Sequence, residues 1–238
     1  MKTSNKILLG TFLAVLLILL SVHIALYAKY KKGEYKIAGD DMWPTNMITY
    51  SLEDVKYVSV DNLENVVIRQ GDSSKLRYDK PIKGDENMLS VTRKDDTLFL
   101  SGKSTLNKKG RWYRPTSLSL AGLLPLKIVN SKIHVGIEPP KTNLAPVAID
   151  IMLDGSFMDV NNRRKDAISF GTFKINAINK STIHLYKLTT NFLDVSLSDS
   201  FLEETTVVAD SIRLVTDAAS KFELSGKNLV KAKIVAHE

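Results

Sequence analysis

The residues with metal-binding or nucleophilic chemistry are scattered along the chain. Its four histidines are His23, His134, His184 and His237, and the last three have no His, Asp or Glu neighbour at zinc-type spacing. Cysteine is absent, which excludes disulfides, thiolate metal ligands and a cysteine nucleophile. The sequence therefore predicts no catalytic residue set, no metal site and no cofactor.

Adjacent acid pairs come closest to an acid–base site. They are Asp95-Asp96 and Glu203-Glu204. Neighbouring residues of a strand point to opposite faces, so neither pair can supply two cooperating carboxylates by itself. Carboxylates that face each other across neighbouring strands are not excluded, which keeps a carbohydrate-active enzyme as an alternative. Our expectation is a protein that is not an enzyme.

The most conspicuous local feature is a basic and aromatic stretch, residues 108–114. Within it, Arg111, Trp112, Tyr113 and Arg114 are the candidate ligand-contact residues, because aromatic rings stack on sugars and cations meet phosphate. The other interpretation is a loop that packs its rings on the domain and leaves its charges in water.

The positive charge of the chain is concentrated at one end. The formal net charge is +7, from 33 Lys and Arg against 26 Asp and Glu. Residues 1–32 hold five lysines and no acid, so the remainder is close to neutral. A nucleic-acid-binding domain needs a basic face on its folded part. We therefore expect no nucleic-acid partner, and flanking lysines that meet anionic lipid.

The N-terminal region predicts a membrane anchor. The segment from Ile7 to Ala28 has no side chain charged at neutral pH and is long enough to span a bilayer as a helix. A cleaved signal peptide is the rival interpretation, but the apolar run is long for one and Leu26 fits its cleavage site poorly. Lysines flank both sides, so charge does not decide the orientation.

Beyond the anchor, the pattern changes to two-residue alternation. Pairs such as Val58/Val60, Ile149/Ile151 and Ile183/Leu185 recur between Asn-, Asp-, Ser- and Gly-rich turns, which predicts an all-β domain. In this interpretation His184 takes an exposed strand position. We divide the chain into a tail (1–6), an anchor (7–28), a spacer (29–52) and the β domain (53–238), in which residues 103–147 form an atypical, insertion-like stretch.

The spacing of the strands narrows the architecture. First apolar positions fall at residues 173, 183, 193, 212 and 222, a step near ten. Such a step fits a β-sandwich, and it equally fits two strands per coil of a β-solenoid. Short strands and small polar residues between them favour the solenoid.

The sequence also resembles a known family, the auto-transporter adhesin head GIN domain found in membrane-anchored or secreted bacterial proteins. The matching positions are Val58 and Val60, Asn65 to Ile68, Gln70-Gly71-Asp72, Leu76 to Tyr78, and Thr97 to Leu100, followed by the repetitive part from Phe173 to Ile234. Residues 103–147 do not match. The resemblance implies a right-handed, single-stranded parallel β-helix on the extracytoplasmic side of the membrane, and it carries no catalytic residue set.

These observations together predict a single-pass protein of the bacterial inner membrane with an extracytoplasmic β-solenoid. We expect a non-enzymatic binding, adhesion or scaffold module whose partners are membrane lipid and a glycan or an envelope protein. Two alternatives stay open, a carbohydrate-active enzyme and a sensor or regulator that contacts a membrane partner around His23.

Overall fold

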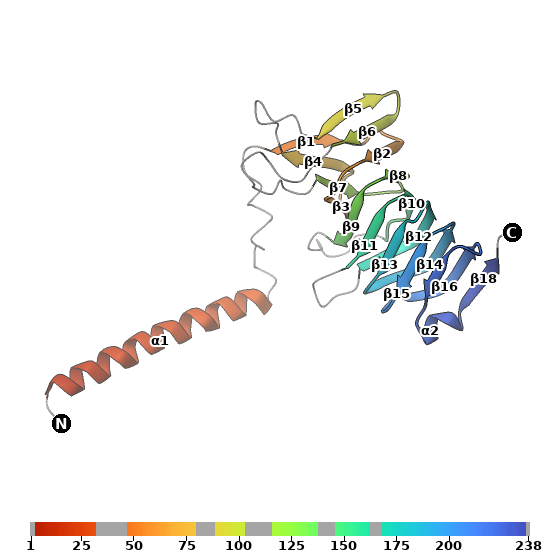
Figure 1. Cartoon of the computed structure of the whole chain (residues 1–238). Helices are drawn as coiled ribbons and strands as arrows, with labels where there is room; N and C mark the ends of the chain where they lie inside the picture. The colour runs from red at the N-terminus through yellow and green to blue at the C-terminus, as the bar shows by residue number, and fades with distance from the viewer. Residues whose placement is uncertain are drawn as a thin grey trace. The chain divides into compact units, whose positions relative to one another are not determined.

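The computed structural model describes residues 3–31, 47–79, 89–102, 116–137, 146–161 and 168–236. The chain divides into two compact units, Met1–Asn46 and Met47–Glu238. The described part of the first unit is one helix, and that of the second consists mainly of strands (Figure 1). The expectation of a β-rich domain after the N-terminal segment is therefore confirmed.

Helix α1 (Thr3–Lys31) includes the whole apolar segment. Its described side chains are exposed, and two polar ones bond back to the helix itself. The hydroxyl of Ser21 donates to the carbonyl oxygen of Ile18 at 2.8 Å. Nδ1 of His23 lies 2.9 Å from the carbonyl oxygen of Leu19. Within the described residues, no helix combines the length and hydropathy that crossing a membrane requires.

The described strands form two nine-stranded sheets, here named sheet A and sheet B. The order in sheet A is β1 (Met47–Ser51), β4 (Lys75–Asp79), β7 (Thr116–Leu120), β3 (Val66–Gln70), β9 (Lys132–Ile137), β11 (Phe157–Val160), β13 (Thr182–Leu185), β15 (Phe201–Glu204) and β17 (Lys221–Glu223). The order in sheet B is β18 (Ala232–Ala236), β16 (Val208–Thr216), β14 (Leu188–Leu197), β12 (Ile168–Ile178), β10 (Ile149–Asp154), β8 (Leu126–Val129), β2 (Tyr57–Asp61), β6 (Thr97–Ser101) and β5 (Ser90–Lys94). A short helix, α2 (Gly226–Leu229), precedes β18 and was not expected.

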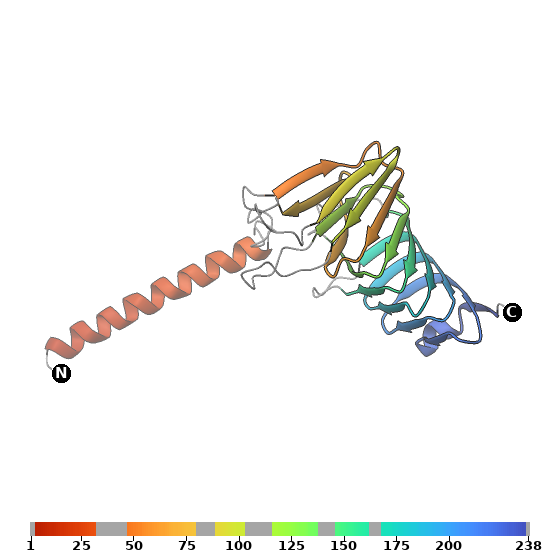
Figure 2. The same cartoon turned by 45° about the horizontal axis from the view of Figure 1, so that its top comes forward.

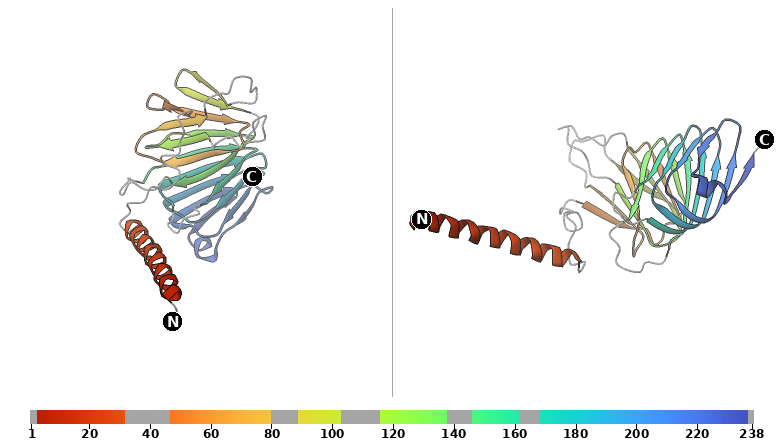
Figure 3. Two further views of the ribbon diagram at one scale, coloured as in Figure 1. Left: turned by 90° about the vertical axis from the view of Figure 1, so that its left-hand side faces the viewer. Right: turned by 90° about the horizontal axis from the view of Figure 1, so that it is seen from below.

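From β8 onward the chain alternates strictly between the two sheets. From β10 onward each strand lies parallel beside the strand two earlier in the chain, so β12 pairs with β10 on one side and β14 on the other. Figures 2 and 3 show these strands following one another through both sheets. We call a strand of sheet B together with the following strand of sheet A a rung.

Pairing at the N-terminal end of the β unit is mixed. The ladders β1·β4, β4·β7 and β5·β6 are antiparallel, so the expectation of parallel pairing throughout is wrong there. The order of the strands in the sheets also differs from their order in the chain. In sheet B, β2 lies between β6 and β8, and in sheet A, β3 lies between β7 and β9. Strands β7, β8 and β9 fall within 103–147, so the described part of that stretch belongs to the sheets.

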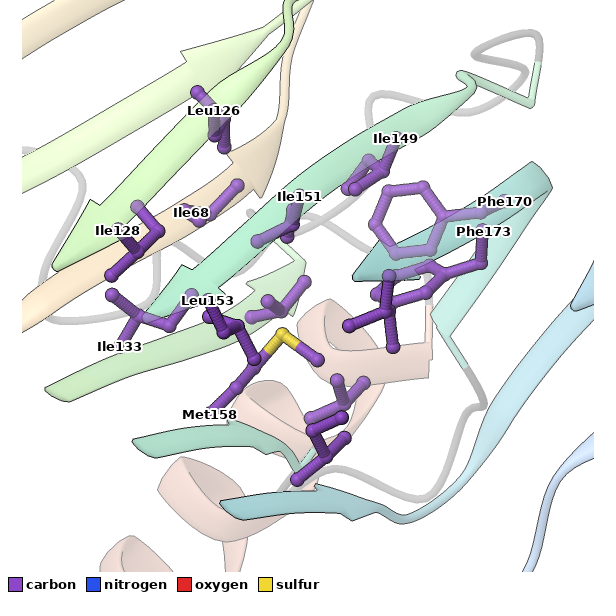
Figure 4. Packing of buried hydrophobic residues seen from close by; sticks show 14 of the residues in the cluster. Ile68, Leu126, Ile128, Ile133, Ile149, Ile151, Leu153, Met158, Phe170 and Phe173 are labelled. Atoms are coloured by element: carbon purple, nitrogen blue, oxygen red, sulfur yellow. The ribbon is translucent and has the colours of Figure 1, made fainter. Parts of the chain in front are cut away.

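The core lies between the two sheets and follows directly from the alternation of the sequence. In β10 the apolar residues Ile149, Ile151 and Leu153 are buried, and the residues between them are partly exposed. In-register pairing places Ile151, Ile175, Val195 and Leu214 beside one another on successive strands of sheet B. Figure 4 shows such side chains from both sheets in contact, among them Ile68, Ile133, Met158 and Phe173.

The turns from sheet B to sheet A repeat one local device. A residue with positive φ comes first, as in Asn130, Gly155, Lys180 and Asp199 (φ 47°, 56°, 63° and 44°). A buried serine follows at positions 131, 156, 181 and 200. The residue with positive φ turns the chain, and the serine immediately precedes the first residue of the strand of sheet A.

These serines link neighbouring rungs through their hydroxyl groups. The hydroxyl oxygen of Ser156 accepts the N–H of Ser131 at 3.1 Å, and that of Ser181 accepts the N–H of Ser156 at 3.1 Å. Ser131 does the same for Leu63 at 3.0 Å, and Ser220 for Ser200 at 3.1 Å. Each hydroxyl satisfies a backbone donor that would otherwise be buried without a partner.

Substituting the central serine should therefore weaken the whole stack. Ser156→Ala removes the acceptor for the Ser131 N–H and a donor to the Asp154 carbonyl at 2.8 Å. We expect a loss of about 1–3 kcal/mol in the free energy of unfolding, because a buried N–H loses its partner. Urea denaturation of the full-length protein measures the loss. The control Ser211→Ala changes an exposed serine of β16, and equal stability of the two variants would contradict the role of the ladder.

The last such turn is organised by a carboxylate. Asp217 accepts hydrogen bonds from the hydroxyl of Ser220 (2.6 Å), the hydroxyl of Ser198 (2.9 Å) and the backbone N–H of Asp199 (3.1 Å). The bond from Ser220, followed by that from Ser198, lowers the pKa of Asp217 from 3.8 to about 2.

The stability contributed by Asp217 should depend on pH with a defined sign. Because its pKa is lower in the folded state than in the unfolded state, the contribution is present above about pH 4 and is lost as the pH falls toward 2. Asp217→Asn should destabilise the protein at pH 7, and the difference from the native chain should shrink over that acidic range. Urea midpoints at several pH values test this, with Asp210→Asn as the exposed control. A difference independent of pH would contradict it.

Candidate ligand-binding face

The basic and aromatic stretch cannot be placed in the fold. Arg111, Trp112, Tyr113 and Arg114 belong to residues 103–115, which lie outside the described residues. Their assignment as ligand-contact residues stays a prediction. Of the two residues that bound the anchor, Ile7 lies in α1 and Ala28 is exposed on it.

The structure places the two carboxylates of the Glu203-Glu204 pair on opposite faces of β15. Glu203 points outward from sheet A, whereas Glu204 is 4% exposed. The Glu204 carboxylate accepts the backbone N–H of Val207 at 2.8 Å and both the N–H and the hydroxyl of Ser225, at 3.0 and 2.9 Å. Glu204 therefore holds two turns together, as the opposite faces of a strand require. Asp95 lies in a turn, with φ 54°.

The outer face of sheet A carries two rows of side chains in register. The first row runs across β9, β11, β13, β15 and β17 and consists of His134, Asp159, His184, Glu203 and Glu223. Nδ1 of His134 lies 3.4 Å from Oδ2 of Asp159, and Nε2 of His184 lies 3.5 Å from Oε2 of Glu203. Imidazoles and carboxylates therefore alternate over four neighbouring strands.

The second row contains two phenylalanines and is named the aromatic row. On the same strands it consists of Lys132, Phe157, Thr182, Phe201 and Lys221. Both phenylalanines are partly exposed. The ammonium group of Lys132 lies 5.0 Å from the centroid of the Phe157 ring, within the range of a cation–π contact.

The two rows meet around one imidazole. The ring of His184 has its centroid 5.1 Å from that of Phe157, 6.2 Å from that of Tyr186 and 6.5 Å from that of Phe201, all in edge-to-face geometry. The hydroxyl of Tyr186 donates to Oε1 of Glu203 at 3.1 Å. We name His184, Phe157, Phe201, Tyr186, Glu203 and Asp159 the His184 cluster.

The environment of Tyr186 favours its neutral, hydrogen-bonding form. Burial raises the pKa of its phenol above 10.0, and the hydrogen bond to Glu203 and the charge of that carboxylate raise it further. The phenol therefore remains protonated and holds one side of the Glu203 carboxylate in place.

The outer face of sheet B differs in character. There the register brings Asp150, Lys174, Asp194 and Arg213 into one row. Lys174 lies 3.1 Å from Asp150, and Arg213 lies 3.4 Å from Asp194. These exposed ion pairs neutralise one another, and the row contains no aromatic ring.

The arrangement on sheet A suits noncovalent binding. Among the described residues no group of three or more His, Cys, Asp and Glu side chains is placed to hold a metal ion. Partly exposed rings beside fixed hydrogen-bonding groups are the usual lining of small-molecule and saccharide sites. The His184 cluster is therefore the candidate site.

Sequence reasoning placed His184 on an exposed strand position. The structure confirms that it points outward, with a side chain that is 28% exposed, but its partners were missed. The outward positions could be inferred from alternation alone. The register could not, because the serine turns recur after 25, 25, 19 and 20 residues, too irregular a step to align distant strands. Asp159 and Glu203 are therefore found only from the fold.

Comparison with known proteins adds little. No protein-family model matches the chain, and no curated protein matches it. Solved structures with similarity to this chain include a candidate adhesin from Bacteroides fragilis NCTC 9343 (17% identity, 81% of this chain and 96% of that chain, TM-score 0.32) and a candidate adhesin from Parabacteroides merdae ATCC 43184 (13%, 81% and 95%, TM-score 0.32). They also include a candidate cell adhesion protein from Clostridium sporogenes ATCC 15579 (10%, 80% and 93%, TM-score 0.28). TM-scores this low establish neither the fold nor the function of this chain, and the resemblance to the head GIN domain stays a prediction.

Replacing Glu203 should lower the pKa of Tyr186. In Glu203→Gln the negative charge that raises the Tyr186 pKa disappears, so that pKa should fall, yet stay above 10.0 because burial is unchanged. NMR titration of ring-labelled tyrosine in the full-length protein measures the shift. Glu223→Gln, one strand further along the row, is the matched control, and equal shifts in both variants would contradict the contact.

Proposed function

We propose that this protein is a non-enzymatic binding or adhesion module of the bacterial cell envelope, in which α1 is a membrane anchor. The β unit is then an extracytoplasmic, right-handed β-solenoid that is parallel apart from the antiparallel ladders of β1, β4 and β5. The observation that carries the proposal is the outer face of sheet A. There, partly exposed aromatic and hydrogen-bonding side chains stand in two aligned rows.

The strands that carry these rows are held in place by the buried core. Ile133, Met158, Ile183 and Leu202 are the inward neighbours of the outer residues, and each is at most 1% exposed. Side chains held on buried strands lose little conformational freedom on binding, which favours affinity for an extended partner. A stack of equivalent strands suits adhesion or scaffolding because it holds its outward side chains in fixed positions.

Sequence supports the anchor. The uncharged run from Ile7 to Ala28 has the length of a bilayer span, and lysines at either end suit the lipid headgroups. Large apolar side chains such as Phe12, Leu17 and Ile18, more than 60% exposed on α1, gain an apolar environment in lipid.

A carbohydrate-active enzyme is the second candidate. Asp159 and Glu203 lie on either side of His184, two strand positions apart, or roughly 9.6 Å at ordinary strand spacing. That is near the upper limit of the carboxylate separation in inverting glycosidases. Both carboxylates already face a histidine, however, so a binding role fits them better than a catalytic one.

Localisation and binding can be measured together on full-length protein with a C-terminal tag in a bacterial host. We expect the tag to fractionate with membranes and to become protease-sensitive in spheroplasts. Those spheroplasts should retain labelled cell-envelope fragments without releasing reducing sugars. A protease-protected tag would contradict the extracytoplasmic location. Failure to retain the fragments would contradict the binding role, and release of reducing sugars would contradict the non-enzymatic role.

Paired variants serve as controls for the anchor. Leu16→Lys combined with Leu17→Lys should move the protein to the soluble fraction, because each lysine at a helix centre costs about 2.5–3.5 kcal/mol in membrane insertion. Leu123→Lys changes an equally exposed leucine of the β unit and should leave fractionation unchanged.

A further inference from the structure

We propose that the His184 cluster is a saccharide subsite that binds a neutral, extended hexose chain. This inference rests on the proposed binding function and names its ligand class. It is carried by the spacing of the rings, the polar groups between them and the balance of charge around them.

The two phenylalanines stand at a spacing that suits such a chain. Phe157 and Phe201 lie in one row with Thr182 between them, on β11, β15 and β13. Two strand spacings separate the backbone positions of the two rings by roughly 9.6 Å. In an extended β-1,4-linked hexose chain every second sugar presents the same face, at a repeat close to this distance. The apolar C–H faces of alternate sugars can then contact the two rings.

Hydrogen-bonding groups lie along one side of the rings. Asp159, His184 and Glu203 form the neighbouring row, two residues further along each strand and on the same face. The side chains of Asp159, His184 and Glu203 are 20%, 28% and 32% exposed, so their remaining lone pairs are open to a ligand. A carboxylate can accept about four hydrogen bonds, and within the described part of the chain Glu203 contacts the Tyr186 hydroxyl and the His184 imidazole. Pairs of sugar hydroxyls are suitable donors.

The charges of the cluster favour a neutral ligand. Lys132 and Lys221 end the aromatic row, and Asp159, Glu203 and Glu223 occupy the next row. The two rows therefore carry two positive and three negative formal charges, and the acidic groups stand where the sugar hydroxyls would bind. Phosphorylated or uronic-acid chains would place their anions against carboxylates, which is repulsive.

The geometry can also be explained as self-stabilisation. Edge-to-face rings and histidine–carboxylate pairs contribute cohesion between neighbouring strands whether or not a ligand binds. A test must therefore measure binding and stability separately.

Binding should be measured with full-length protein in detergent micelles by calorimetry, using cellohexaose as the neutral probe and polygalacturonate as the anionic one. We expect saturable binding of cellohexaose and none of polygalacturonate. Phe157→Ala and Phe201→Ala should each weaken cellohexaose binding about tenfold, the loss of one aromatic contact. Phe157→Tyr keeps a ring and should retain the affinity.

The matched control is Phe99→Ala, which removes a 41% exposed phenylalanine from the outer face of sheet B and should leave binding unchanged. Thermal unfolding of each variant shows whether lost binding merely reports lost folding. Stronger binding of polygalacturonate, no binding of cellohexaose, or unchanged binding in folded Phe157→Ala and Phe201→Ala would overturn the proposal. If envelope fragments are retained while cellohexaose is not bound, the ligand class fails and the proposed function stands.

Discussion

The structure depends on keeping neighbouring parallel strands in register at the turns. A residue with positive φ turns the chain, and the hydroxyl oxygen of the buried serine that follows accepts a hydrogen bond from a backbone N–H of the adjacent turn. Ser156 accepts in this way from Ser131, and Ser181 from Ser156. Apolar residues alone would not fix this alignment, because Ile, Val and Leu pack against one another almost equally well after a shift of two residues. The hydroxyl bonds distinguish the correct register from its alternatives.

Register in turn determines what the surface presents. Once strands are aligned, every outward side chain stands beside the outward side chains of the neighbouring rungs. On sheet A this places His184 between Asp159 and Glu203, and it places Phe157 and Phe201 in one row on either side of Thr182. On sheet B the same rule produces alternating charges, with Lys174 beside Asp150. One core therefore supports two faces of different chemistry.

Because the inward residues stabilise the fold, the outward residues can differ in type from one face to the other. Inward residues such as Ile183 and Leu202 are almost completely buried and carry the hydrophobic stabilisation. Outward residues between them contribute smaller contacts, so their types can change with little cost to the fold. Glu204 shows the limit of that freedom, because its buried carboxylate holds two turns and is part of the architecture. Its neighbour Glu203 faces the solvent and a potential ligand.

Sequence by itself determined the β-rich character of the chain beyond its N-terminal segment, the helical N-terminal segment and the outward position of His184, because period-two alternation and uniform apolarity are local properties. Only the tertiary structure decided the antiparallel ladders at β1, β4 and β5, the interior place of β2 and β3, and the partners of His184. Those features depend on which distant strands meet. Turns that recur at 25, 25, 19 and 20 residues leave that choice to packing and hydrogen bonding across the whole stack.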